Sequence, residues 1–346
     1  MWRFVDPIVC GWENKVTPML HYKPDTIPDF PISAVGPAQT TQITKKNTIG
    51  VIGLGKMGSG LALQLAEKGW SVAGYNRTFE TTQEYAKQGI IAAQTVPELT
   101  SKLSTPRVVI ISLPATAATD DVLFGKNGLV SQLSSGDIII DSGNAFYKDT
   151  QKRAAECAKS GLEYIDMGTS GGPKGARYGA CLMIGGKREF FEYLKPIFVD
   201  LAQPEGFAFF EGVGAGHFAK MVHNGIEYGM MQALAEGFEI LHASDLKYDL
   251  QEVARIYNAG SVIESRLVGW LQEAFERWGV DLHEVTSTVA HTGEGAWTIE
   301  VAKQMGIPTP IITGSLEFRK QSGAKPSFTG KLLSAMRGMF GGHATK

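Results

Sequence analysis

The sequence TIGVIGLGKMGSGLALQLAEKGWSVAGYNRT, residues 48–78, indicates the architecture of most of the chain. A short apolar run, residues 49–53, passes directly into the glycine-rich GLGKMG, which is followed by the helix-like LALQLAEKG and the strand-like SVAGYN. A GxGxxG between a strand and a helix is the dinucleotide-binding fingerprint, because its glycines allow a tight turn, close approach of backbone to a pyrophosphate, and packing of helix on strand. We therefore predict that a dinucleotide contacts Gly53, Gly55, Lys56, Met57 and Gly58.

The end of the second predicted strand, Tyr75-Asn76-Arg77-Thr78, indicates which dinucleotide is bound. An acidic residue at this place would bond the ribose 2'-hydroxyl of NAD and repel a 2'-phosphate. The position holds no acid here. Arg77 can instead pair with a phosphate, while Asn76 and the Thr78 hydroxyl can donate hydrogen bonds. We expect NADP to be the cofactor, with NAD less favoured.

Apolar runs alternate with amphipathic stretches from Thr48 onward, which is typical of a parallel sheet wrapped in helices. Further strands are predicted at residues 107–113, 137–141 and 163–166. Ligands of such sheets bind at the carboxyl ends of the strands, so residues 113–114, 142–144 and 168–172 are candidate site segments. The predicted fold class is α/β: an N-terminal Rossmann-like, doubly wound parallel sheet followed by an all-α C-terminal domain.

Three segments are expected along the chain. Residues 47–212 form an NADP-binding Rossmann-like domain, and residues 213–346 form a helical substrate and dimerisation domain with a C-terminal tail. Residues 1–46 are an N-terminal extension with six of the 15 prolines, no hydrophobic periodicity, and acidic residues that argue against a signal or transit peptide. A disordered tail, an arm packed on the surface and a misassigned start codon are all open alternatives for this extension.

Composition places the chain among soluble globular proteins with two cores. Of its 346 residues, 43% are apolar and 20% are charged, and the formal net charge is -2 with a pI near 6.4. This balance, without any run of basic residues, argues against nucleic acid or an anionic membrane as a partner. Three scattered cysteines without CxxC spacing argue against a structural metal site, and no apolar run reaches the roughly 18 to 20 residues of a membrane span. We expect a cytoplasmic protein that acts on a small molecule.

A second informative stretch is GAGHFAKMVHNGIEYG, residues 214–229, which is predicted to open a long helix. At 100° per residue, one side of this helix carries Lys220, His223, Asn224, Glu227 and Tyr228. A base, an acid, an amide and a phenol on one rigid element can hold a substrate and transfer protons. The alternative is a solvated polar face.

The other side of this helix is expected to point toward a core through residues such as Met221 and Ile226. Glycine lowers helix propensity by about 1 kcal/mol relative to alanine. We therefore expect Gly225, Gly229 and Gly237 to mark close packing against another backbone or a ligand.

Together these segments resemble the 6-phosphogluconate dehydrogenases, in their short form, within the β-hydroxyacid dehydrogenase superfamily. The resemblance runs from about Asn47 to the C-terminus and rests on GLGKMG, YNRT, DIIIDSGN, the SGGPKGARYG run from Ser170, and GAGHFAKMVHNGIEYG. Broader β-hydroxyacid dehydrogenases share the fingerprint, the SGG loop and a lysine with a following asparagine. They lack the pair Glu227-Tyr228 on the same helix.

The resemblance implies oxidative decarboxylation of 6-phosphogluconate to ribulose 5-phosphate and CO2, with NADP accepting the hydride, as in the pentose phosphate pathway and gluconate utilisation. Lys220 would take the proton from the C3 hydroxyl and then, as an ammonium, polarise the new ketone. Glu227 would protonate the enediol at C1. Burial against NADP is expected to lower the pKa of Lys220 and to raise the pKa of Glu227.

The remaining roles that the resemblance implies are in binding. On the substrate hydroxyls and carboxylate it places Asn144, Ser170, Gly171, Gly172, His223 and Asn224. Leu113, Pro114 and Asn144 would contact the cofactor. Tyr228 and Arg319 would bind the phosphate from this subunit, whereas the family counterparts of Arg337 and His343 come from a neighbouring one. A homodimer or homotetramer is therefore expected, and no metal, since the lysine replaces the Lewis acid.

The chain also departs from the family pattern. The familiar long form has a much larger helical second domain than the roughly 130 residues present here. Pro114 stands where the long form carries a lysine, and Met230 where an acid is usual. The stretch HTGEGAWT, residues 291–298, matches only loosely, and no role is predicted for His291 or Thr292.

Two other functions are weighed against this one. The first is a β-hydroxyacid dehydrogenase of the 3-hydroxyisobutyrate type, acting on a small acid without phosphate; Arg319 and Tyr228 argue against it. The second is a non-catalytic NADP-binding or regulatory protein, against which the presence of both Lys220 and Glu227 argues.

Overall fold

The computed structural model describes residues 42–291, 293–342 and 345. Thr40–Lys346 form one compact unit, which contains every described residue. Most of the predicted N-terminal extension, residues 1–41, lies outside the described residues, as do Thr292 and His343. The predicted division near residue 212 stays a prediction, although the last strand ends at Glu211 and the next helix begins at Ala215.

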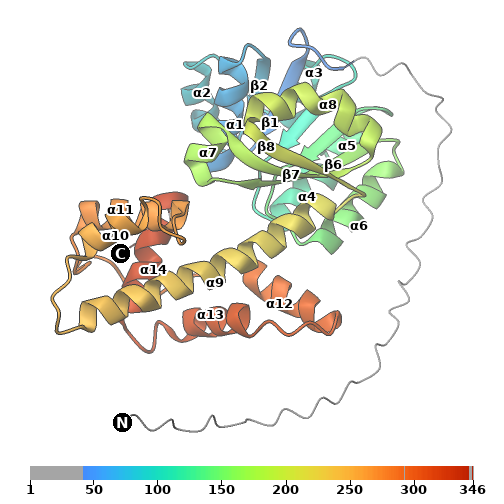
Figure 1. The fold of residues 1–346 in the computed structure, drawn as a ribbon. Helices are drawn as coiled ribbons and strands as arrows, with labels where there is room; N and C mark the ends of the chain where they lie inside the picture. The colour runs from blue at the N-terminus through green and yellow to red at the C-terminus, as the bar shows by residue number, and fades with distance from the viewer. Residues whose placement is uncertain (1–41, 292, 343–344, 346) are drawn as a thin grey trace, which may run out of the picture. The chain divides into compact units, whose positions relative to one another are not determined.

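An eight-stranded sheet forms the first part of this unit, in the order β3-β2-β1-β4-β5-β6-β7-β8 (Figure 1). The strands are β1 Thr48–Ile52, β2 Ser71–Tyr75, β3 Ile91–Ala93, β4 Val108–Ile111, β5 Ile138–Asp141, β6 Glu163–Ser170, β7 Ala180–Gly186 and β8 Ala202–Glu211. The first six strands pair in parallel, β7 is antiparallel to β6, and β8 is parallel to β7. The predicted α/β class with a parallel sheet is therefore confirmed.

Both faces of the sheet are buried, which explains why its central strands are continuous apolar runs. Ile138 and Ile140 of β5 belong to one hydrophobic cluster, while Ile139 between them belongs to the other. Alternation of side chains along a strand thus supplies two cores. The first core is covered by α1 Lys56–Glu67, α7 Gly172–Tyr178 and α8 Arg188–Leu201. The second is covered by α3 Val96–Ser101, α4 Ala117–Phe124, α5 Leu129–Gln132 and α6 Tyr147–Ala158, and α2 Phe79–Ala86 follows β2.

The second part of the unit is helical, as predicted. It is opened by α9 Ala215–Ala243, a 29-residue helix that begins against β6 and β7 and runs on into the helical part (Figure 1). The other helices are α10 Leu250–Tyr257, α11 Arg266–Trp278, α12 Glu294–Gln304, α13 Pro310–Gln321 and α14 Phe328–Gly341. A third hydrophobic core is formed by α9, α10, α11 and α14, and in it Phe238 of α9 packs against Phe275 of α11 with ring centroids 5.9 Å apart.

A buried carboxylate fixes the start of α9 to the sheet. Gly214 has no side chain to cap the helix, and Asp166 of β6 takes over this function. Its Oδ1 accepts a hydrogen bond from Gly214 N at 2.7 Å, and its Oδ2 accepts one from His217 N at 2.8 Å. The His217 ring is held in turn by Thr150 Oγ1, 2.8 Å from Nδ1. The helix that carries the candidate site therefore has a fixed origin on strand β6.

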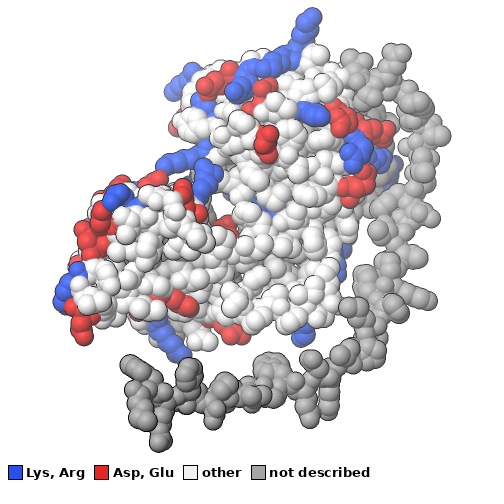
Figure 2. Space-filling view, in the orientation of Figure 1, with Lys and Arg blue, Asp and Glu red and all other residues white. Residues whose placement is uncertain are grey.

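Charged side chains of both signs are interspersed on the face drawn in Figure 2, without one large region of a single sign among the described residues. None of the helices in the described part of the chain combines the length and apolar character needed to cross a bilayer.

Candidate active site

A cavity of about 850 Å³ lies where the carboxyl ends of the parallel strands face the helical part. Its lining contains most residues that the sequence singled out: Gly55, Lys56, Met57, Gly58, Leu113, Pro114, Asn144, Ser170, Gly171, Gly172, Lys220, His223, Asn224, Glu227, Tyr228, Arg319 and Arg337. The predicted residues Gly53, Asn76, Arg77 and Thr78 do not line it. They lie at the nucleotide-loop end of the sheet, next to β1 and β2.

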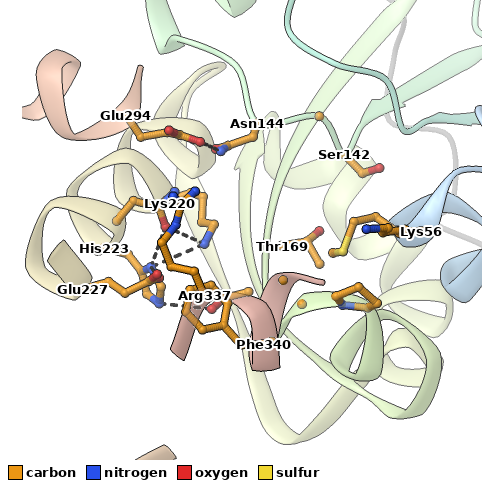
Figure 3. Close-up of a pocket in the computed structure, with 18 of the residues that line it drawn as sticks. Lys56, Ser142, Asn144, Thr169, Lys220, His223, Glu227, Glu294, Arg337 and Phe340 are labelled. Atoms are coloured by element: carbon orange, nitrogen blue, oxygen red, sulfur yellow. Dashed lines mark hydrogen bonds and ion pairs between the residues drawn. The ribbon is translucent and has the colours of Figure 1, made fainter. Parts of the chain in front are cut away.

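The polar face of α9 forms one wall of the cavity (Figure 3). Lys220 Nζ donates a hydrogen bond to Asn224 Oδ1 at 2.7 Å. His223 joins this pair, with its Nδ1 3.0 Å from Asn224 Oδ1 and its Nε2 3.1 Å from Ser170 Oγ. Glu227 Oε2 lies 3.9 Å from His223 Nδ1. The helix and the loop after β6 are thus linked through one histidine.

This face is not a solvated one, because α12, α13 and α14 pack on α9. Lys220 is only 8% exposed and Tyr228 only 5%. The expected core residue Met221 is buried, but Ile226 is 53% exposed and lines the cavity, so the prediction for Ile226 is wrong. Gly225 does pack closely, against Thr298. Gly237 has no heavy atom of the described residues near its Cβ position, against expectation.

Burial changes the acid–base properties of this wall. It lowers the pKa of Lys220, while the negative charges of Glu227 and Glu294 act in the opposite direction. Burial raises the pKa of Glu227, opposed by the positive charges of Lys220, Arg319 and Arg337. These are the predicted directions, although the burial comes from the protein itself. Both shifts increase the fraction of the neutral form near neutral pH, the amine of Lys220 and the carboxylic acid of Glu227.

Two buried arginines occupy the far end of the cavity. The Arg319 guanidinium lies 3.4 Å from the centre of the Tyr228 ring, and burial lowers the pKa of Arg319 to about 10. Arg337 donates a hydrogen bond to the carbonyl of Ala290. The Arg319 Nη2 also faces the sulfur of Met231, and none of these described partners carries a negative charge. Buried cations without a contacting anion favour an anionic ligand.

Arg337 reaches the cavity from its own chain. This residue is on α14 and lines the cavity of its own chain. Gly172 allows α14 to come this close, because a Cβ at residue 172 would lie 2.0 Å from Phe340 O. The backbones of the SGG loop and of α14 are therefore in close contact at this point.

The fingerprint loop can hold a dinucleotide. Gly53 adopts a φ of +91°, and a Cβ there would lie 2.4 Å from Ser112 O, so the turn requires glycine. Gly55, in contrast, faces open space in the cavity wall. Helix α1 begins next to it with no side-chain cap and no acid in its first turn, which leaves its N–H groups available to an anion. Lys56 Nζ donates to Gly342 O at 2.6 Å, so the end of α14 reaches this loop.

Asn76 and Arg77, which were expected to select the cofactor, differ in the contacts of their side chains. The Asn76 side chain is already used within the loop: its Oδ1 accepts from Leu54 N at 3.2 Å, and its Nδ2 donates to Thr78 O at 3.2 Å. Asn76 therefore positions the fingerprint. Arg77 is exposed and forms no ion pair or hydrogen bond with the described residues, so it is available to a ligand.

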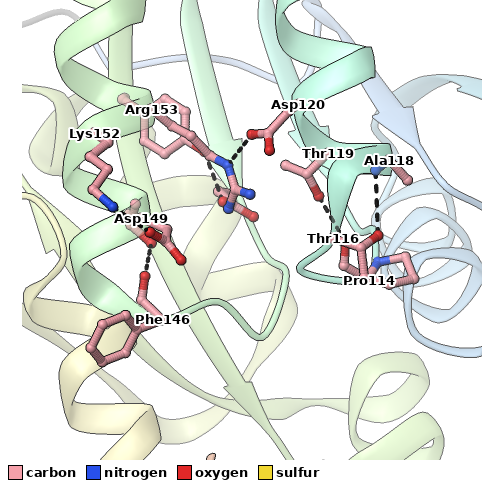
Figure 4. Close-up of polar contacts among 12 residues, drawn as sticks. Pro114, Thr116, Ala118, Thr119, Asp120, Phe146, Asp149, Lys152 and Arg153 are labelled. Carbon is pink, nitrogen blue, oxygen red and sulfur yellow. Dashed lines mark hydrogen bonds and ion pairs between the residues drawn. The ribbon is translucent and has the colours of Figure 1, made fainter. Parts of the chain in front are cut away.

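The loop after β4 is held by its own polar contacts (Figure 4). Pro114 O accepts hydrogen bonds from Thr116 N at 2.7 Å and from Thr119 Oγ1 at 2.9 Å. Nearby, Arg153 Nε donates to Asp120 Oδ1 at 2.7 Å and ties α6 to α4. Pro114 thus presents a fixed backbone to the cavity, although it cannot supply the positive charge of the lysine usual in the long form.

Besides Arg266, sequence reasoning missed a more deeply buried charged residue of the cavity, Glu294. It is the first residue of α12, it is 5% exposed, and Asn144 Nδ2 donates a hydrogen bond to it. Trp270 of α11 and Phe340 of α14 also line the cavity, with ring centroids 4.9 Å apart. The HTGEGAWT stretch that contains Glu294 matches the family pattern only loosely, so the sequence predicts no role for Glu294.

Comparison with known proteins agrees with this geometry. The model of the NAD binding domain of 6-phosphogluconate dehydrogenase matches residues 48–215, and that of the 6-phosphogluconate dehydrogenase C-terminal domain matches residues 216–327. The chain belongs to the 6-phosphogluconate dehydrogenase family. It is an oxidoreductase of this family, and its sheet-containing part is an NAD(P)-binding domain.

Relatives in the 6-phosphogluconate dehydrogenase family differ in cofactor. The Bacillus subtilis (strain 168) protein YqeC, named only provisionally as a 6-phosphogluconate dehydrogenase, is 41% identical over 86% of this chain and 99% of its own length. The NAD(+)-dependent decarboxylating enzyme of Haloferax volcanii is 36% identical over 85% of this chain and 97% of its own. The NADP(+)-dependent enzyme of Bacillus subtilis is 39% identical, and the match covers 81% of this chain but only 62% of that longer protein.

Solved structures place the fold in the same group. The Plasmodium falciparum 6-phosphogluconate dehydrogenase, studied with NADP+ and with 6-phosphogluconate, has a TM-score of 0.69 and 31% identity, covering 84% of this chain and 70% of that one. A 3-hydroxyisobutyrate dehydrogenase from Salmonella typhimurium has a TM-score of 0.66 at 19% identity, covering 82% and 98%, which shows a shared fold.

Proposed function

We propose that the protein catalyses the oxidative decarboxylation of 6-phosphogluconate to ribulose 5-phosphate and CO2, with NADP as the oxidant. The observation that carries this proposal is the content of a single cavity. A buried lysine and a half-buried glutamate on one face of α9 lie between the dinucleotide fingerprint and two buried arginines, Arg319 and Arg337, whose described partners are an aromatic ring, a sulfur atom and a carbonyl group.

The proposed binding roles follow from these positions. Arg319, Arg337 and Tyr228 bind the substrate phosphate, since two guanidinium groups and a phenol can neutralise and hydrogen-bond a dianion. Asn144, Ser170, Gly171, Gly172, His223 and Asn224 bind the hydroxyl and carboxylate groups. The fingerprint residues Gly55 to Gly58 hold the pyrophosphate at the start of α1.

The proposed chemistry uses Lys220 and Glu227. Lys220, as a neutral amine, accepts the proton of the C3 hydroxyl. NADP, held by the fingerprint residues, would supply the acceptor for the hydride that leaves C3. The resulting ammonium of Lys220 polarises the C3 ketone, the bond between C1 and C2 breaks, and CO2 leaves with its electron pair retained in an enediol. Glu227, as a neutral acid, then protonates the carbon that becomes C1 of ribulose 5-phosphate. The raised pKa of Glu227 and the lowered pKa of Lys220 support these two roles.

NADP is favoured over NAD because Arg77 is exposed beside the fingerprint, has no partner among the described residues, and residues 76–78 after β2 contain no acid. A homodimer or homotetramer is also proposed. Ile240 of α9 and Ile311 of α13 are 71% and 70% exposed, and exposed apolar side chains on packed helices favour a protein partner. A cytoplasmic enzyme of the pentose phosphate pathway or of gluconate use is the corresponding prediction.

A substrate panel tests the proposed function. Initial rates are measured with 6-phosphogluconate, gluconate and 3-hydroxyisobutyrate, each with NADP and with NAD, and released CO2 is measured alongside. We expect turnover of 6-phosphogluconate with NADP and one CO2 per reduced cofactor. Indifference to the phosphate, or turnover of 3-hydroxyisobutyrate without CO2, would instead identify a β-hydroxyacid dehydrogenase. A chain that binds NADP but turns over none of the acids would support the non-catalytic alternative.

A further inference from the structure

Glu294 lies in the cavity but has no place in the chemistry described so far. Its side chain comes from the HTGEGAWT stretch at the start of α12 and is 95% buried, since only 5% of the residue is exposed. A carboxylate in such a place lowers stability unless it is paired or hydrogen-bonded. Its Oε1 accepts a hydrogen bond from Asn144 Nδ2, and Asn144 comes from the loop after β5. The contact joins two elements separated by 150 positions in the chain.

The position of Glu294 is fixed relative to Lys220. Thr298, one turn along α12, has its Oγ1 2.8 Å from the carbonyl of Met221 on α9 and 2.9 Å from the carbonyl of Glu294. A Cβ at Gly225 would lie 2.7 Å from Thr298 Cγ2, so the two helices touch at this point. The first turn of α12 is therefore locked to the part of α9 that carries the lysine.

The titratable groups around Lys220 come from three elements. Glu227 and His223 lie on α9 itself, Cys181 on β7, and Glu294 on α12. In Figure 3, Glu294 and Asn144 lie on one side of Lys220, and His223 and Glu227 on the other. The charge of Glu294 also acts on Arg337.

We propose that Glu294 is a positioning residue of this site: it orients the Asn144 amide beside Lys220 and supplies the second negative charge that the lysine experiences. This role deepens the proposed function and rests on it for its effect on rate, but not for its effect on Lys220. With Glu294 present, the amide of Asn144 has one defined orientation, because its Nδ2 faces the carboxylate and its Oδ1 must face elsewhere. Without it, Glu227 is the carboxylate that still offsets the burial of the lysine.

The first experiment does not depend on any substrate. Cofactor-free protein is labelled with trace acetic anhydride over a pH series, and mass spectrometry gives the extent of acetylation of Lys220. In Glu294→Gln the labelling curve is expected to move to lower pH, because loss of a negative charge lowers the pKa of the amine. The matched control is Glu300→Gln, an exposed glutamate on the same helix, whose curve should coincide with that of the wild type. Coincidence of the Glu294→Gln curve with the wild-type curve would overturn the proposal.

The second experiment separates the charge from the contact. Lys220 must be neutral to accept a proton, so kcat/KM for 6-phosphogluconate falls as the pH drops through its pKa. A lower pKa moves this acidic limb to lower pH in both Glu294→Gln and Glu294→Ala. Only Glu294→Ala also releases the Asn144 amide. Its kcat is expected to fall below that of the wild type by a factor of up to about ten. In an Asn144→Ala background, Glu294→Ala should lower kcat little further.

These readouts distinguish the possible failures. If the role of Glu294 were purely structural, Glu294→Ala would have a lower melting temperature and a lower kcat. The acidic limb of its kcat/KM profile and its labelling curve would then coincide with those of the wild type, which would contradict the proposal. If the wild type does not turn over 6-phosphogluconate, the proposed function is wrong, and the labelling curves still decide the role of Glu294.

Discussion

At the scale of single residues, the phosphate end of the cavity is defined by buried positive charge. Arg319 and Arg337 are 3% and 6% exposed, and their described partners are an aromatic ring, a sulfur atom and a carbonyl group. Burying such cations without an anion costs free energy that the fold must supply elsewhere. A phosphate dianion would offset this cost on binding, which favours a phosphorylated substrate over an acid of the same length without phosphate.

Arg77 is predicted to select NADP. Replacing it in Arg77→Asp removes a positive charge and adds the acid that prefers a ribose hydroxyl, so KM for NADP should rise about 10- to 100-fold, the effect of one lost charge-assisted hydrogen bond. KM for NAD should fall or stay unchanged. Steady-state kinetics with both cofactors measure this, and Lys87→Asp, an exposed cation at the end of α2, is the matched control. An unchanged KM for NADP in Arg77→Asp would show that another group reads the 2'-phosphate.

Helical periodicity was enough to predict which residues of α9 share a face, because that geometry is local. It could not predict which face is buried. Tyr228 is covered and Ile226 is exposed because α12, α13 and α14 pack on α9, and these helices lie more than 60 positions further along the chain. Glu294 escaped prediction for the same reason: nothing in its neighbours in sequence indicates that it meets Asn144.

At the scale of elements, the apolar runs of β1, β2, β4, β5 and β6 were predicted because strands buried on both faces must be apolar throughout. The edge strand β8 was missed. It contains Pro204, Gly206 and a residue with positive φ, Glu205, and most of its residues are partly or fully exposed, so its sequence lacks a strand pattern. Strand β3 has only three residues, too few for any periodicity to show.

The contact of Asp166 with the start of α9 predicts an effect on stability. In Asp166→Asn one of the two acceptor oxygens is replaced by an N–H donor that would face a backbone N–H. We expect the free energy of unfolding to fall by about 1–3 kcal/mol, and kcat to fall because Lys220 is carried by this helix. Denaturant unfolding measures the first effect. Asp245→Asn, an exposed position just beyond the other end of α9, is the control and should change stability by no more than about 0.5 kcal/mol. Equal stability of the two variants would exclude Asp166 as the cap.

At the scale of the whole molecule, one chain contributes residues to the cavity from its first strand loop to its last helix. The fingerprint lysine Lys56 is hydrogen-bonded to Gly342 at the end of α14, and Arg337 from the same helix reaches the opposite end of the cavity. The resemblance implies that the family counterpart of Arg337 comes from a neighbouring subunit. In the structure Arg337 lines the cavity of its own chain, and we predict that it acts there.

This arrangement predicts that two defective chains cannot rescue each other. Lys220→Met and Arg337→Met should each be nearly inactive, and co-expression of the two, with mixed oligomers isolated through different affinity tags, should restore no activity. If Arg337 acted on the neighbouring subunit, each mixed dimer would contain one complete site, and the isolated mixed dimers would regain about half of the wild-type rate per chain. Co-expression of Lys220→Met with the wild type, which should give about half of the wild-type rate per chain, controls for mixing.

The close contact between Gly168 and Lys220 limits how this enzyme could be redesigned. A Cβ at residue 168 would lie 2.5 Å from that of the lysine, so strand β6 and helix α9 leave no room for any larger residue there. Changes made in the sheet would therefore displace the lysine along with the substrate. New specificity is more accessible through α12, α13 and α14, whose side chains reach the cavity from outside this contact. A library confined to those three helices would vary what is bound while leaving the proton-transferring helix in register with the sheet.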